Sequence, residues 1–226
     1  MRKVICSAIL TSITATSVFA FDLPKIPGVQ STSAAPAAPA GTDAVAMQEG
    51  VVKNYVDAAA HVNEAQIHLA KAFDLKDEVA KLEAEATALQ SSSVDKSTLE
   101  KQKKTSADLN AEVEKRISNG AQLSDVGKKE YAASLLPFAT GVAKSTKLPA
   151  ELQSFATAAQ QQISSASIMD KMQVTNKLSV GTYLVSNAPG FIANTATSFK
   201  QIVTYAQSNK IPVPKEATDA LGGLAP

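Results

Sequence analysis

Two histidines and two carboxylates in the stretch DAAAHVNEAQIHLAK are the strongest candidates for chemistry in this chain. They are Asp57, His61, Glu64 and His68, and the histidines are the only two in the sequence. The steps between them are four, three and four residues, which places all four on one side of a helix. Imidazole and carboxylate groups at such spacings hold zinc or iron in helical bundles. The pattern therefore makes this row a candidate metal site.

The apolar pattern of the same segment favours a plainer interpretation. A heptad stripe is formed by Val45, Val52, Tyr55, Ala59, Val62, Leu69 and Phe73, with Gln66 as its one polar interruption. A helix that buries this stripe turns the histidine row toward solvent. A bound metal pair needs inward-facing ligands from several helices, and the chain offers no further histidine. We therefore expect a solvated row with weak ion pairing, no cofactor, and only adventitious or partner-shared metal binding.

Other catalytic motifs are missing or incomplete. The SVDK stretch at Ser93–Lys96 matches the Ser-x-x-Lys of serine acyl-enzymes, but the companion Ser-Asp-Asn and Lys-Thr-Gly motifs do not occur. Helix capping explains this stretch better. The sequence also lacks a Cys-x-x-Cys-His haem motif and a glycine-rich phosphate loop. We expect a protein that is not an enzyme.

The first twenty residues resemble a secretory signal. Arg2 and Lys3 form a short basic region, an apolar stretch follows, and Val18-Phe19-Ala20 suits a cleavage site. The only cysteine, Cys6, lies inside this segment and too close to the N-terminus to accept a lipid. We expect export to the periplasm or the exterior, without lipidation, and a mature chain that contains neither disulfides nor thiolates.

Charge and composition argue against several classes of partner. Without Arg2 and Lys3, the 22 basic residues fall to 20 against 21 acidic residues, so the mature chain is nearly neutral. Arg116 is then the only arginine, and the chain has no tryptophan. Because arginine is the usual residue for gripping phosphates, we expect no nucleic-acid partner.

The chain divides by composition into a signal (1–20), a disordered Pro- and Ala-rich lead (21–41), a helical domain (42–210) and a loose C-terminal tail (211–226). Periodicity and capping residues predict helices over 43–90 with a kink near Asp77, 96–118, 125–146, one long or two short helices from 148, and 191–208. The apolar residues of 96–118 form only a narrow stripe. We expect that helix to lie outside or to project in a hairpin.

The most apolar stretch after the signal is LSVGTYLVSNAPGFIANTATSF, residues 178–199. Its central SNAPG is a turn signal, which predicts a buried hairpin. A membrane-inserting tongue is the alternative, but Asn187, Asn194 and several threonines make insertion costly. We expect no stable insertion into a membrane.

The fold class predicted from these patterns is all-α, an antiparallel bundle of five or six helices. The predicted function is that of an exported, non-catalytic protein that binds an envelope or extracellular protein or acts as a scaffold. A carrier of a small apolar ligand or metal is the first alternative, and a membrane-active helical protein is the second.

Overall fold

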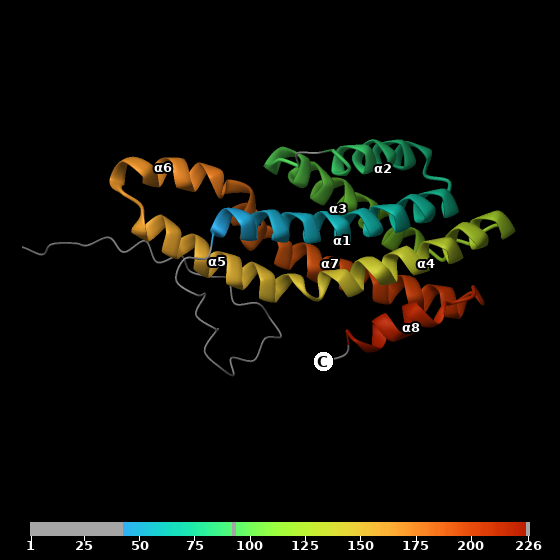
Figure 1. Ribbon diagram of the computed structural model, residues 1–226. Helices are drawn as coiled ribbons and strands as arrows, with labels where there is room; N and C mark the ends of the chain where they lie inside the picture. The colour runs from blue at the N-terminus through green and yellow to red at the C-terminus, as the bar shows by residue number, and fades with distance from the viewer. Residues whose placement is uncertain (1–42, 92–93, 225–226) are drawn as a thin grey trace, which may run out of the picture.

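The computed structural model describes residues 43–91 and 94–224, and this part of the chain is helical without any strand (Figure 1). The all-α fold class is confirmed. The helices are α1 (Ala44–Ala72), α2 (Lys76–Leu89), α3 (Lys96–Ser118), α4 (Asp125–Ser145), α5 (Leu148–Ser165), α6 (Ile168–Lys177), α7 (Ser179–Ser208) and α8 (Lys215–Gly222). The predicted signal (1–20) and lead (21–41) lie outside the described residues.

Helix α1 is central, and its most extensive packing is against α4. In Figure 1, α2 lies above α1 and α3 begins above α1 and passes behind it, while α4 and α5 run back below α1 in the opposite direction. The backbones of α1 and α4 approach closely at Gly141 of α4. A Cβ added there would lie 2.7 Å from Val62 Cγ2 and 3.0 Å from the Ala58 carbonyl oxygen, both of α1. Small residues at this contact allow the close approach.

Aromatic pairs along α4 and α7 form much of the core. Phe138 and Phe199 lie 5.5 Å apart between ring centroids, and Tyr131 and Tyr205 lie 5.1 Å apart. The Tyr131 hydroxyl donates to the Ile202 carbonyl oxygen at 3.0 Å, so its polar end is satisfied inside the core. Burial raises the pKa of this phenol well above its usual range.

The limits of α3 follow the capping residues in the sequence. Asp95 Oδ1 accepts the Thr98 N–H at 2.8 Å and caps the N-terminus. Gly120 takes a positive φ of 70° just after the helix, a conformation that suits glycine. The helix observed, Lys96–Ser118, has the bounds predicted from the sequence.

The first predicted helix does not continue to residue 90. Helix α1 ends at Ala72, and Asp74 adopts a left-handed φ of 55°. The Leu75 N–H then donates to the Ala70 carbonyl oxygen at 2.8 Å, and the Asp74 N–H donates to that of Lys71. These bonds form a helix-ending motif that usually contains glycine. Because aspartate occupies this position, the sequence pattern predicts only a kink near Asp77.

The predicted turn at SNAPG is wrong, because α7 continues through it from Ser179 to Ser208. Pro189 lies inside the helix and removes one backbone hydrogen bond. The buried stripe of α7 nevertheless keeps a helical period through this region, with Gly181, Leu184, Ala188, Phe191 and Thr195 all buried. Residues 179–199 therefore form part of one long helix instead of a hairpin, because continuous burial outweighs the local turn signal.

The segment predicted as a loose C-terminal tail, residues 211–226, contains a further helix in its described part. Residues 215–222 form α8, which packs on α4 and α7. Ala217 is fully buried in this contact, and Ile211, just before the helix, is buried as well. Burial of these two apolar side chains holds the segment against the body, and two residues form a pattern too short to stand out in the sequence.

The pair formed by α2 and α3 lies along α1 instead of projecting. Its interface combines apolar residues, such as Leu82 and Leu109, with polar ones. Asn63 Nδ2 donates to the Leu82 carbonyl oxygen at 2.9 Å, and Gln66 Nε2 donates to Ser106 Oγ at 2.8 Å. The narrow apolar stripe predicted for α3 is thus supplemented by buried amides.

Candidate functional site

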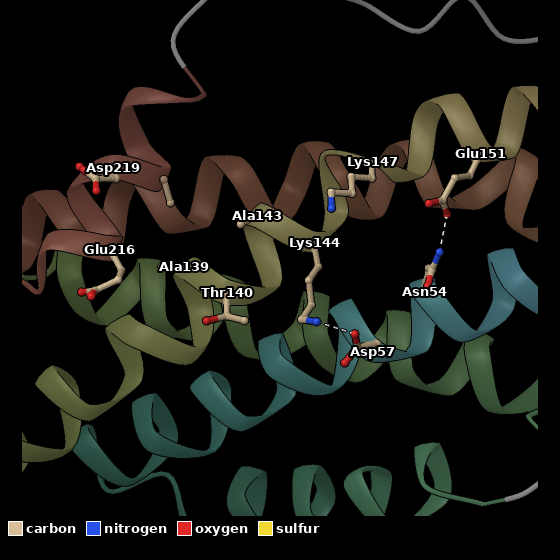
Figure 2. Close-up of a pocket in the computed structure, with 11 residues that line it drawn as sticks. Asn54, Asp57, Ala139, Thr140, Ala143, Lys144, Lys147, Glu151, Glu216 and Asp219 are labelled. Atoms are coloured by element: carbon tan, nitrogen blue, oxygen red, sulfur yellow. Dashed lines mark hydrogen bonds and ion pairs between the residues drawn. The ribbon is translucent and has the colours of Figure 1, made fainter.

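A groove of about 790 Å³ lies between α1, the α4–α5 junction and α8 (Figure 2). Its lining comes from α1, from the consecutive helices α4 and α5, and from α8. The lining residues are Asn54, Asp57, Ala139, Thr140, Ala143, Lys144, Lys147, Glu151, Glu216, Asp219 and Ala220. Helix α8 supplies Glu216, Asp219 and Ala220. The groove therefore exists only because α8 docks on α4.

Small side chains leave room between α4 and α8. Ala139, Thr140 and Ala143 come from one side of α4, and Ala220 comes from α8. The Thr140 hydroxyl donates to the Leu136 carbonyl oxygen of its own helix at 3.0 Å. A hydroxyl bound in this way is not paired with a side-chain base that would activate it as a nucleophile.

Two polar pairs join α1 to the opposite wall. Lys144 Nζ lies 2.6 Å from Asp57 Oδ2, and Asn54 Nδ2 donates to Glu151 Oε2 at 2.9 Å (Figure 2). Asp57 and Lys144 are each about half exposed, so water screens this pair and its contribution to stability is small. The pairs fix the orientation of the charged wall more than they stabilise the fold.

Two charged groups of the groove have no ion-pair partner among the described residues. They are Lys147, at the junction of α4 and α5, and Glu216 of α8. The neighbouring Asp219 is engaged by Lys215 at 2.5 Å. Glu216 interacts electrostatically with Lys215 but forms no ion pair with it, so one cation and one anion can each accept a charged partner at separate places along the groove. Chemically, the groove can pair with charges of both signs and accommodate a chain over its alanines.

The predicted helix phase of α1 is confirmed. The stripe residues Tyr55, Val62 and Leu69 are buried. In contrast, the side chains of the histidine row, Asp57, His61, Glu64 and His68, are between 31 and 60 % exposed. The row follows the solvent edge of the contact between α1 and α4. His68 Nδ1 lies 2.8 Å from Glu130 Oε2 of α4, a contact that sequence spacing could not reveal.

The four candidate metal ligands do not converge on one point. His61 Nε2 lies 3.6 Å from Asp57 Oδ1, while His61 Nδ1 lies 3.8 Å from Glu64 Oε2, so the carboxylates approach opposite ring nitrogens. His68 faces Glu130 instead of His61. In the part of the chain that the structure describes, no three residues of metal-binding type are grouped to hold an ion.

Sequence reasoning found one groove residue, Asp57, and missed the others. Glu216 and Asp219 are spaced three residues apart, which is a sign of one charged helix face. They lie in the segment predicted as a tail, where the sequence pattern indicates no partner helix. The alanines of α4 resemble ordinary core positions until α8 is placed beside them.

Comparison with known proteins adds no relative, because no family model, curated protein or solved structure gives a significant match to this chain. The class of the protein is therefore defined by its own features, an all-helical fold with an open, charge-lined groove. Within the described residues, no helix combines the length and apolarity that crossing a membrane requires.

Proposed function

We propose that this chain is an exported, non-catalytic protein that binds a segment of a partner protein in the groove beside α8. The observation that carries the proposal is the presence of two charged groups outside the ion pairs of the described residues, Lys147 and Glu216, on either side of an alanine-lined passage. Alanines allow a polypeptide to approach closely, and the separated charges favour one direction of binding. Export rests on the signal pattern of residues 1–20.

The charge balance indicates the kind of segment that would fit. Asp57, Glu151, Glu216 and Asp219 outnumber Lys144 and Lys147 in the lining. The complementary segment carries a basic residue toward the α8 end and an acidic residue toward Lys147. Such pairs contribute more to orientation and rate of association than to affinity, so binding should weaken as salt is raised.

A photo-crosslinking residue placed at Thr140, inside the groove, tests the proposal in the cells that produce the protein. The matched control is the same residue at Thr197, which is exposed on α7. We expect an adduct of one defined mass at Thr140 and none at Thr197. Adding Glu216→Lys should reduce that adduct at least tenfold. Equal adducts at both positions, or an adduct that Glu216→Lys leaves unchanged, would refute the proposal.

A carrier of a small molecule is a second candidate, because the groove volume lies within the range of about 300–1,000 Å³ typical of ligand sites. The charged lining suits a polar ligand rather than the apolar one predicted from the sequence. Native mass spectrometry of protein isolated from its own cells separates the two candidates. A carrier shows a fixed small added mass that Glu216→Lys removes, whereas a partner-binding protein shows none.

A further inference from the structure

Helix α6 presents an apolar face to solvent. Three large apolar residues of this helix are largely exposed: Ile168 (90 %), Met169 (89 %) and Met172 (75 %). No residue of α6 is fully buried. Elsewhere in the described chain, the exposed large apolar residues are Val126 and Leu136, which are ten positions apart on α4 and less exposed. A contiguous exposed group of large apolar side chains is a mark of an interaction surface.

The local structure holds this face outward. Ser167 caps α6 by accepting the Asp170 N–H at 3.2 Å, and its hydroxyl contacts Asp170 Oδ2 at 2.6 Å. At the other end, Leu178 is fully buried and anchors the helix to the core. With Val174 partly buried against the core, the helix has a defined inner side, so the methionines cannot turn inward without breaking these contacts.

The described chain begins beside this helix. The Ala44 N–H donates to Gln162 Oε1 of α5 at 3.1 Å, and Gln48 Nε2 donates to the Lys177 carbonyl oxygen, at the end of α6, at 2.9 Å. Figure 1 shows the start of α1 between α5 and α6. The residues that precede Asp43 therefore enter the structure at the end of the molecule that carries α6.

Those preceding residues include one apolar segment after the signal pattern, FDLPKIP at 21–27. The intervening residues 28–42 are mostly small and carry no charged side chain. Sixteen residue steps reach at most about 50 Å, whereas α6 is about 15 Å long. The segment can therefore reach any part of α6 from Asp43.

We propose that residues 21–27 of the same chain dock on the face formed by Ile168, Met169 and Met172. Methionine side chains adapt to irregular partners, which suits a segment broken by two prolines. The short connection raises the effective concentration of the segment at α6 to the millimolar range, so a small apolar contact suffices. The proposal goes beyond the groove and does not depend on it.

Disulfide formation within the chain tests this docking. The full chain carries Cys6→Ser, so that the introduced cysteines are the only ones, together with Ile26→Cys and Met172→Cys. The matched control replaces Met172→Cys with Lys177→Cys, which lies on the same helix but about 140° around it. Both positions are equally within reach of residue 26, so only docking on the apolar face distinguishes them.

In dilute protein, we expect the disulfide between positions 26 and 172 to form at least ten times faster than that between 26 and 177. Adding Phe21→Ser and Leu23→Ser should bring the two rates together, because the apolar side chains drive the contact. Equal rates in the first comparison, a rate unaffected by the serines, or disulfides found only between two chains would each overturn the proposal. The last result would assign the face to a second copy.

Discussion

At the residue scale, Gly141 sets the separation of α1 and α4. A methyl group there would meet Val62 Cγ2 at 2.7 Å and the Ala58 carbonyl oxygen at 3.0 Å, and a backbone oxygen cannot rotate away. We expect Gly141→Ala to lower the free energy of unfolding by about 1–3 kcal/mol, measured by urea denaturation, because the helices must separate.

Gly50 of α1 provides the control for Gly141. An added Cβ at Gly50 meets nothing within 4 Å, so the substitution changes only helix propensity. Gly50→Ala should raise the free energy of unfolding by up to about 1 kcal/mol. Effects of the same sign and size at both glycines would show that the contact between α1 and α4 is looser than described.

Glu85 of α2 gives a prediction that depends on pH. Burial raises the pKa of its carboxyl group, and a hydrogen bond with Thr105 opposes this only in part. A raised folded-state pKa means that the contribution of Glu85 to stability is full at low pH and is lost as pH rises through that pKa. Glu85→Gln should therefore stabilise the protein at pH 7, by about 0.5 kcal/mol or less.

This gain should vanish below about pH 4, where the glutamate is protonated in both folded and unfolded states. Urea unfolding of the parent and of Glu85→Gln, at pH 7 and below about pH 4, measures this difference in the free energy of unfolding. Glu49, which is exposed on α1, is changed to Gln as the control for the loss of one negative charge. A Glu85→Gln variant that is less stable than the parent at pH 7 would contradict the assigned cost of burial.

At the scale of elements, sequence signals succeeded where they were local and failed where packing decided. The bounds of α3 could be predicted because Asp95 and Gly120 are standard residues for helix ends. The end of α1 was missed because Asp74 holds a conformation that usually needs glycine. The course of α7 was missed because Pro189 and Gly190 signal a turn, whereas the buried stripe on either side keeps one helix.

The candidate site was less predictable than the fold. The outward phase of the histidine row followed from the heptad, but its contacts with Lys144 and Glu130 depend on how α4 lies beside α1. The groove also needs α8, whose docking rests on Ala217 and Ile211. A pattern of two apolar residues carries too little information to predict a packed helix.

Helix α8 gives a prediction that joins element to function. Ala217→Glu places a charge in the fully buried contact with α4, so α8 should detach while the rest of the fold remains. Amide exchange in 215–222 should accelerate at least a hundredfold, and the adduct expected at Thr140 should disappear. Thr218→Glu, exposed on the same helix, is the control and should change neither. Unchanged exchange in Ala217→Glu would show that α8 is held by other contacts.

At the scale of the whole molecule, the buried polar groups are unevenly distributed. Among the described residues, the buried side-chain atoms without a hydrogen-bond partner belong to Asn63, Gln66, Glu78, Glu85 and Gln102. All of these residues lie on α1, α2 and α3, at or near the contact of the α2–α3 pair with α1. Buried groups without partners weaken an interface, since they lose water and gain nothing in exchange. The contact between α1 and α4 carries no such atom among the described residues.

This distribution predicts that α2 and α3 open together before the rest of the molecule unfolds. When α2 and α3 open, the unpartnered amides and carboxylates regain hydrogen bonds with water. The free energy of this opening is therefore lower than that of separating α1 from α4. Native-state hydrogen exchange at increasing urea should show α2 and α3 opening at a free energy about 2 kcal/mol or more below that of α1, α4 and α7. A single opening free energy for all the helices would show instead that the α2–α3 pair unfolds only with the whole, and that its polar contacts are stronger than their geometry indicates.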